Sequence, residues 1–290
     1  MTRTKSCELC GSNEFGEILN SEMQECRKCT VQYPSEVPHS GVVTNQFPIS
    51  PSGRGSFLAR SQARLVKPLY SNKQLIDIGC GNGAFLYAIN RQKLKPQKIM
   101  GVELDPRSSQ AAADAGVLVT SEIPPNVRNA LLTMWHVAEH IAVDEFKRLL
   151  SELQHSSNSL LISVPNGNSY SWIKFGKKFS FYDSKSHLIQ YTPRSLRKIL
   201  VDTGWKIDKE FYTPVYGLFN AFQTGINLYR PHNEIYQSVK REGNPISTLI
   251  LLKTLVPILR AIRPIFMMSI YELKKQKCSS YTILSSGTGF

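Results

Sequence analysis

QLIDIGCGNGAFL, residues 74–86, is the stretch that decides the fold. An apolar run ends in three glycines at alternating positions, Gly79, Gly81 and Gly83, and apolar residues at helical spacing follow them. This order predicts a strand, a tight turn and a helix, with the turn at the carboxyl end of the strand. Open α/β sheets bind ligands at that end, and glycine lets the backbone approach a ligand without an intervening side chain. The stretch therefore predicts an α/β fold with a ligand at the glycine turn.

A second apolar run, residues 98–102, ends at Glu103, whose carboxylate can accept hydrogen bonds from two ribose hydroxyls. A glycine-rich turn alone is weak evidence for a ligand site of this kind, and the carboxylate of Glu103 makes that evidence stronger. A dinucleotide-binding protein would have a third glycine at position 84. That residue is Ala84, and because alanine is sometimes tolerated there, the spacing by itself does not decide between nucleotide-binding families.

Residues 75–83 and 101–106 resemble the first motif and the end of the second strand of the class I S-adenosylmethionine-dependent methyltransferases. The resemblance implies a doubly wound, seven-stranded Rossmann-like methyltransferase sheet that uses S-adenosylmethionine as cofactor. It also implies a set of cofactor-binding residues: Asp77, Gly79, Cys80, Gly81, Gly83, Glu103, Leu104, Trp135 and His136.

The fourth strand, residues 130–134, runs into WHVAEHI, residues 135–141. As written, the segment matches the His-x-x-Glu-His pattern of one class of zinc proteases, but that pattern needs both histidines on one long helix, and here it follows a strand directly. The segment also resembles the WHVLEH segment of the type 23 branch of the methyltransferases, with Ala138 in place of leucine. A structural role, in which Glu139 and His140 cap the next helix or fix the turn, remains an alternative.

His187 lies in a polar and aromatic loop, residues 167–190, five residues before Thr192. It matches the histidine of a segment of the same branch, although Lys185 and Ser186 replace the proline and arginine that precede that histidine in the family. Histidine titrates near neutral pH and is therefore suited to remove a proton from the methyl acceptor. The catalytic candidates are His187, His136, His140 and Glu139.

Four of the six cysteines form two Cys-x-x-Cys pairs separated by 15 residues. This spacing is typical of a four-thiolate zinc site, which is structural when it is closed. The sequence therefore predicts a small N-terminal zinc ribbon, with the metal ligands Cys7, Cys10, Cys26 and Cys29. Residues 1–50 carry four basic and six acidic side chains, so a nucleic-acid-binding ribbon is not favoured.

The net charge of +13 is concentrated beyond the ribbon, which suggests an anionic acceptor or an anionic membrane surface. Nucleic acid is not the expected partner, because no Asn/Asp-Pro-Pro-Tyr segment follows the fourth strand. The first residues lead into polar, Cys-containing sequence rather than an apolar run, so we expect a cytoplasmic protein. Homo-oligomerisation is left open.

The C-terminal third contains an apolar segment, residues 246–264, that is interrupted by Lys253, Arg260 and Arg263. The interruptions leave no stretch of the ~20 apolar residues that a membrane span needs. A helical lid, a helix lying on the inner membrane surface and a dimer face are the alternatives.

These observations predict a zinc ribbon and linker at 1–50, a methyltransferase domain at 51–213 and a basic, apolar helical insertion or lid at 214–264. By the resemblance, 265–275 is the last sheet strand, and 276–290 is expected to be a flexible tail. The function expected is methyl transfer to a small-molecule acceptor, with a sugar, nucleotide-sugar or surface-polysaccharide precursor as the leading class. The alternative is a non-catalytic module that binds RNA or a membrane and retains the fold.

Overall fold

The computed structural model describes residues 6–19, 21–36, 54–178, 183–184, 186–212 and 280–287. Their centre is a seven-stranded sheet in the order β6-β5-β4-β7-β8-β10-β9, in which β10 runs in the direction opposite to the other six strands. The strands are β4 (Gln74–Ile78), β5 (Ile99–Val102), β6 (Val119–Thr120), β7 (Ala130–Trp135), β8 (Ser159–Pro165), β9 (Trp205–Tyr212) and β10 (Ser280–Gly287). The strand order reverses between β4 and β7, which is where such sheets bind ligands.

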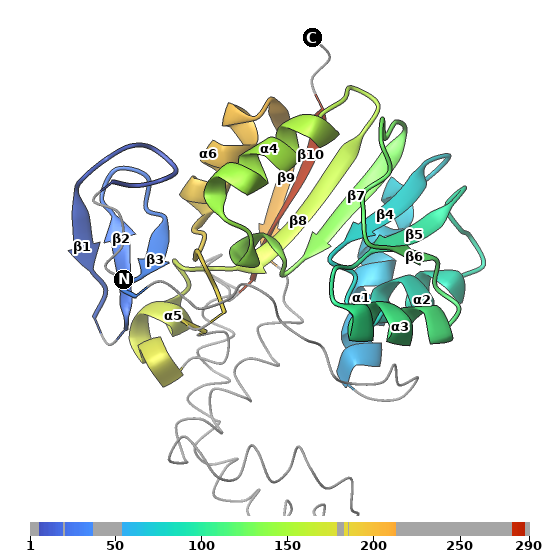
Figure 1. The fold of residues 1–290 in the computed structure, drawn as a ribbon, viewed down its shortest axis with the longest axis horizontal. Coiled ribbons are helices and arrows are strands. Elements are labelled where there is room, and N and C mark those ends of the chain that lie inside the picture. The colour runs from blue at the N-terminus through green and yellow to red at the C-terminus, as the bar shows by residue number, and fades with distance from the viewer. Residues whose placement is uncertain are drawn as a thin grey trace, which may run out of the picture.

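Helices cover both faces of this sheet, and the alternation of side chains along each strand explains why. Leu75, Leu131 and Leu161 point to the face covered by α1 (Arg54–Val66), α2 (Ala84–Asn90) and α3 (Pro106–Asp114). Their neighbours Ile76, Leu132 and Ile162 point to the opposite face, which α4 (Val143–Leu153) and α6 (Pro193–Asp202) cover (Figure 1). Strands buried on both faces read as continuous apolar runs, as β4, β7 and β8 do. The predicted doubly wound sheet is confirmed.

Two helices begin where the sequence places their caps. The Asp105 side chain accepts a hydrogen bond from Ser108 N at 2.9 Å, and Pro106 is the first residue of α3. Thr192 caps α6 reciprocally with Ser195, and Pro193 opens that helix. Proline is tolerated at this position because the first N–H groups of a helix have no intrahelical partner. The expected loop 167–190 also contains a short helix, α5 (Tyr170–Phe175), and the remaining short turns are η1 (Lys67–Leu69), η2 (Ala138–His140) and η3 (Gly176–Lys178).

The N-terminal region is a separate antiparallel sheet of β1 (Phe15–Glu17), β2 (Met23–Cys26) and β3 (Gln32–Pro34). It lies beside α5 and α6 in Figure 1. Backbone hydrogen bonds join Gln32 of β3 to Gln190 in both directions, at 3.0 and 2.8 Å. This small sheet is therefore tied to the segment that follows His187.

The last strand of the sheet is not the predicted one. The segment 265–275 lies outside the described residues, as does the insertion 214–264, and β10 occupies part of the predicted tail, 276–290. The prediction is wrong because β10 reads as polar, with hydroxyl side chains that are nevertheless buried. The Ser280 and Thr282 hydroxyls lie 3.1 and 3.2 Å from Ser163 Oγ of β8 and are hydrogen-bonded inside the sheet.

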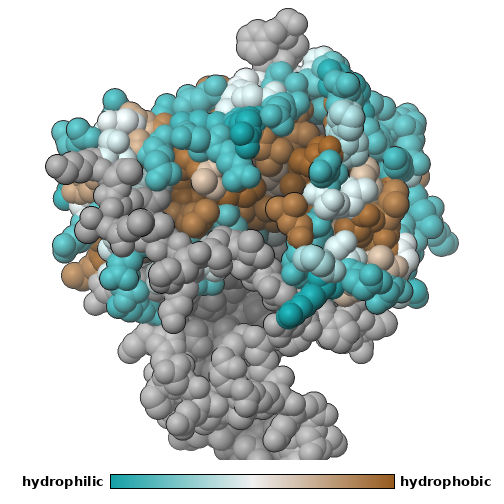
Figure 2. Space-filling view, viewed as in Figure 1, coloured by the Kyte–Doolittle hydropathy of each residue, from teal (hydrophilic) through white to brown (hydrophobic). Residues whose placement is uncertain are grey.

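Polar residues surround one face of the molecule, and apolar residues gather toward its middle (Figure 2). Within the part of the chain that the structure describes, every helix is too short or too polar to cross a bilayer.

Candidate functional site

The glycine turn joins β4 to α2 and gives the site its shape. Gly79, Gly81 and Gly83 have φ angles of 69°, 54° and 73°, a region that side chains rarely adopt. A Cβ atom on Gly79 would lie 2.5 Å from Val137 Cγ2, which belongs to the segment after β7. The turn therefore needs glycine both for its backbone conformation and for the close approach of β7.

Glu103 holds the glycine turn against the end of β5. Its Oε2 accepts a hydrogen bond from Gly81 N at 2.7 Å, and its Oε1 accepts one from Asp105 N at 2.9 Å. The carboxylate is thus fixed at the carboxyl edge of the sheet, in the position expected for binding a ribose diol. Leu104, the next residue, is 76% exposed, so its side chain is available for an apolar contact with a flat ring.

Asp77 is buried at the end of β4 and accepts a hydrogen bond from Thr133 Oγ1 of β7 at 2.7 Å. Burial raises the pKa of Asp77 to about 8, the Thr133 hydrogen bond opposes this rise, and the nearby Glu103 charge adds to it. A cation placed beside Asp77 would favour the ionised carboxylate. The amino group of S-adenosylmethionine would be such a cation.

The remaining cofactor candidates contribute differently. The Cys80 side chain is buried against Gly101, where a Cβ would lie 2.4 Å from its Sγ, and its thiol donates to the Gly81 carbonyl of the turn at 3.7 Å. The Trp135 ring packs edge-on against Phe85, with ring centroids 5.4 Å apart. Trp135, the last residue of β7, therefore packs against α2, the helix that follows the glycine turn.

His136, Glu139 and His140 do not lie on one helix. His136 has a φ of 58°, and only Ala138–His140 form a single 3-10 turn, η2. This geometry excludes the zinc-protease arrangement, which needs two histidines one turn apart on an α-helix. The Glu139 carbonyl accepts hydrogen bonds from Leu188 N and Ile189 N at 2.9 and 3.3 Å. The backbone therefore brings His187 to η2 across more than 40 positions of sequence.

Glu139, His140 and His187 form a compact cluster in which their potential ligand atoms lie within 4.8 Å of one another. The rings of His140 and His187 pack edge-on with centroids 4.8 Å apart, and His140 Nδ1 lies 3.0 Å from the Ser186 carbonyl oxygen. His136 completes the group, since its Nδ1 lies 3.5 Å from Glu139 Oε1. All four catalytic candidates thus meet at the end of β7, next to the glycine turn.

Burial and mutual contact set the charges in this cluster. Burial tends to raise the pKa of Glu139, but His136 and the other two histidines outweigh it, so the pKa is lowered and the carboxylate is ionised. The pKa of His187 is lowered by burial, which favours its neutral imidazole. Burial likewise raises the pKa of Tyr191, whose ring is fully buried nearby. The site therefore combines one buried negative charge with a neutral imidazole.

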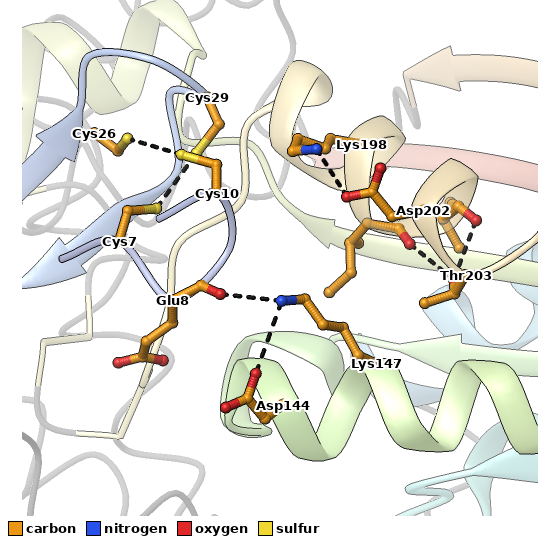
Figure 3. A network of polar contacts seen from close by, with 12 residues as sticks. Cys7, Glu8, Cys10, Cys26, Cys29, Asp144, Lys147, Lys198, Asp202 and Thr203 are labelled. Atoms are coloured by element: carbon orange, nitrogen blue, oxygen red, sulfur yellow. Dashed lines mark hydrogen bonds and ion pairs between the residues drawn. The ribbon is translucent and has the colours of Figure 1, made fainter. Parts of the chain in front are cut away.

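The four ribbon cysteines also converge (Figure 3). Cys7 Sγ lies 3.6 Å from Cys29 Sγ, Cys10 Sγ lies 3.6 Å from Cys26 Sγ, and all four sulfurs lie within 4.8 Å of one another. Bonds of ~2.3 Å in a tetrahedral zinc site place sulfurs about 3.8 Å apart. The pKa of Cys7 is lowered to about 4, chiefly by the hydrogen bond from Cys29. The donor set and its spacing fit zinc.

Side-chain contacts seat the ribbon on the sheet domain. Thr30 Oγ1 lies 2.6 Å from Thr192 Oγ1 at the start of α6, and Gln32 Nε2 donates to the Gly167 carbonyl at 2.9 Å. Lys147 of α4 donates to the Glu8 carbonyl at 3.0 Å (Figure 3). The ribbon therefore braces both ends of the segment 167–192, which carries His187.

Sequence reasoning missed two participants. Thr133 is a polar residue inside the apolar run of β7, and that position could have marked it as a partner for a buried group. The Ser186 carbonyl carries no side-chain signal at all, because any residue supplies the same acceptor.

Comparison with known proteins agrees with this architecture. Residues 52–210, more than half of the chain, match the family model described as a methyltransferase domain. The [4+2]-cyclase SpnF is 12% identical with a TM-score of 0.50, over 86% of this chain and 89% of its own. An S-adenosylmethionine-dependent methyltransferase from Archaeoglobus fulgidus is 18% identical with a TM-score of 0.47, over 81% and 95% of the two chains. A possible histamine N-methyltransferase from Thermotoga maritima is 14% identical with a TM-score of 0.47, over 81% and 91%.

No curated protein sequence matches the chain. The family match spans the glycine turn, Glu103 and the cluster of Glu139 with the three histidines. The chain therefore belongs to the methyltransferase domain family and is a class I S-adenosylmethionine-dependent methyltransferase.

Proposed function

We propose that the protein methylates an oxygen of a small, anionic, hydroxyl-bearing acceptor, with a sugar, nucleotide-linked sugar or surface-polysaccharide precursor as the leading class. The observation that carries the proposal is the cluster of Glu139 and three histidines at the end of β7. Val137, between His136 and Glu139, packs on Gly79 of the glycine turn, so the cluster adjoins the cofactor cradle. The excess of basic residues supports an anionic acceptor.

Bound S-adenosylmethionine supplies a methyl group on a sulfonium, already activated for transfer. Glu103 and the glycine turn orient its nucleoside and amino-acid ends, and alignment of this kind is the main contribution of a methyltransferase scaffold. His136 accepts the proton of the acceptor hydroxyl, and the Glu139 carboxylate stabilises the resulting imidazolium. The acceptor oxygen bonds to the methyl carbon as the carbon–sulfur bond breaks, and the sulfur keeps the electron pair.

Cofactor binding is tested by calorimetry with S-adenosylmethionine on wild type, Glu103→Ala and Glu145→Ala. Glu145 is an exposed carboxylate on α4 and serves as the matched control. Loss of two hydrogen bonds to a carboxylate should weaken binding at least tenfold in Glu103→Ala alone. Equal affinity in all three proteins would contradict the assignment of the cradle.

Transfer is tested by following methyl incorporation into a panel of sugars and nucleotide sugars with wild type, His136→Gln and His187→Ala. Loss of a general base should lower turnover about 10²–10⁴-fold while cofactor affinity stays nearly constant. If His187→Ala alone produces this loss, the base is His187 instead of His136. Cofactor binding without turnover on any acceptor would favour the binding-module alternative.

The zinc ion on Cys7, Cys10, Cys26 and Cys29 is part of the proposal and is structural, since four thiolates leave no open coordination position. The four cysteines are not joined by disulfide bonds, which supports a cytoplasmic location. Contact with the inner membrane surface through residues 246–264 and homo-oligomer formation belong to the proposal as well.

A further inference from the structure

We propose that Glu139, His140 and His187 bind a divalent transition-metal cation, which holds the acceptor oxygen beside the methyl group. The role of the cation toward the acceptor rests on the proposed function. The binding of the cation itself does not, because it follows from the geometry of the three side chains.

The three groups are spaced for a shared ion rather than for direct hydrogen bonds. Their potential ligand atoms lie within 4.8 Å of one another. Among the described residues, Glu139 Oε2 and His187 Nδ1 are buried without a hydrogen-bond partner, and Glu139 Oε1 has a long contact of 3.5 Å with His136 Nδ1. Ligands around an ion with bonds of 2.0–2.2 Å lie about 3 to 4.4 Å apart, so small side-chain movements would complete the site. Buried polar atoms without partners are costly, and an ion would satisfy Glu139 Oε2 and His187 Nδ1 together.

His140 is held in the state that a metal requires. Its Nδ1 lies 3.0 Å from the Ser186 carbonyl oxygen, and because a carbonyl can only accept, Nδ1 carries the proton. The lone pair is then on Nε2, the nitrogen available to a cation. A backbone carbonyl behind a ligating histidine commonly fixes the tautomer and the ring orientation in this way.

Two imidazoles and one carboxylate define the class of ion. Zinc, manganese and ferrous iron accept this donor set, and three protein ligands leave coordination positions for water or substrate. An acceptor hydroxyl in such a position loses its proton more readily, as metal-bound water does. His136 faces Glu139 Oε1 from outside the three ligands and remains placed to take that proton.

The site is tested by zinc analysis of the full chain after loading and desalting, on wild type, Glu139→Gln, His187→Gln and the control His155→Gln. His155 lies outside the cluster and contacts Ser157. We expect about two zinc ions per chain in wild type and in the control, and about one in the two cluster variants, where only the cysteines bind. One ion per chain in wild type would overturn the proposal, as would an unchanged two in both cluster variants.

Cobalt replacement of wild type separates the two sites and needs no variant to fold. Cysteine thiolates give cobalt an intense charge-transfer band, whereas nitrogen and oxygen ligands give only weak absorption. We expect the weak bands to saturate separately from the thiolate band, and their absence would also overturn the proposal. If the protein transfers methyl groups with only one zinc ion per chain, the metal site is refuted and the proposed function stands. If it binds two zinc ions per chain but transfers no methyl group, the metal site stands and the proposed function is refuted.

Discussion

Asp77 is a buried carboxyl group at the end of β4, hydrogen-bonded to Thr133. Its pKa is raised to about 8 by burial, against 3.8 for an ordinary aspartate. A carboxyl group whose folded pKa is raised contributes stability below its unfolded pKa and loses it as pH rises through the folded value. In the cofactor-free protein, Asp77 therefore lowers stability progressively between about pH 4 and pH 8.

Replacing Asp77 by asparagine should remove this loss, because the amide cannot ionise. We expect Asp77→Asn to be more stable than wild type at pH 8 and nearly equal at pH 4, as measured by urea unfolding across that range. Thr133→Val is the companion variant: it removes the hydrogen bond that lowers the pKa of Asp77. Parallel stability curves for wild type and Asp77→Asn would contradict this account.

The sequence reveals residues whose signal is local and hides those whose position depends on distant contacts. Gly79, Gly81 and Glu103 were predictable because glycine spacing and a carboxylate at a strand end are short-range patterns. The meeting of His187 with Glu139 was not, since it depends on backbone hydrogen bonds from Leu188 and Ile189. At this scale, the sequence named Glu139 and the three histidines as candidates but did not predict that they lie together, and their catalytic role stays a prediction.

At the scale of elements, the glycine turn is a joint between β4, α2 and the segment after β7. Gly79→Ala would combine a positive φ with a contact of 2.5 Å to Val137. Gly116 has a similar φ of +77° but nothing within 4 Å, so Gly116→Ala isolates the backbone strain. We expect Gly116→Ala to cost about 1 kcal/mol and to bind cofactor normally. Gly79→Ala should lose more stability and most cofactor affinity, as measured by chemical unfolding and calorimetry.

The ribbon supports the segment that follows His187 from one side. Hydrogen bonds from Gln32 and Thr30 reach Gln190 and Thr192 on its C-terminal side. Removing the proposed zinc ion should therefore increase hydrogen exchange at residues 186–192 while the amides of β4 and β5 stay protected. Cys10→Ser provides the same test without a chelator. Unchanged hydrogen exchange at residues 186–192 in a zinc-free protein would show that the ribbon does not stabilise the His187 segment.

Elements were predicted best where an apolar run ends in a turn or a polar residue, as at β4, β5 and β7. They were predicted worst at β10. The last strand was predicted at 265–275 because that segment is apolar, whereas the strand in the structure is Ser280–Gly287. Pairing of the Ser280 and Thr282 hydroxyls with Ser163 removes the cost of burying them. A polar strand of this kind cannot be found from hydropathy alone.

At the scale of the whole molecule, charge is the property that we expect to select partners. Lys253, Arg260 and Arg263 lie outside the described residues, and their spacing in sequence predicts a shared helical face. Reversing all three charges should weaken association with vesicles containing phosphatidylglycerol, and the loss should shrink as salt is raised. Sedimentation with vesicles of stated composition measures this. Equal sedimentation of wild type and variant would contradict membrane binding through these three residues. An anionic acceptor would then be the remaining explanation for the net positive charge.

β10 lies between β8 and β9 in the sheet, yet it is the last of the seven strands to be synthesised. At roughly 5–20 residues per second, a ribosome needs several seconds to travel from Tyr212 to Ser280. During that time the edge of β8 lacks its neighbour, and an open strand edge is a template for pairing with another chain. A ribosome that stalls in this interval would release a polypeptide with a complete cofactor cradle and an unprotected edge. Such fragments should be insoluble, and nascent chains of this length should depend on chaperones.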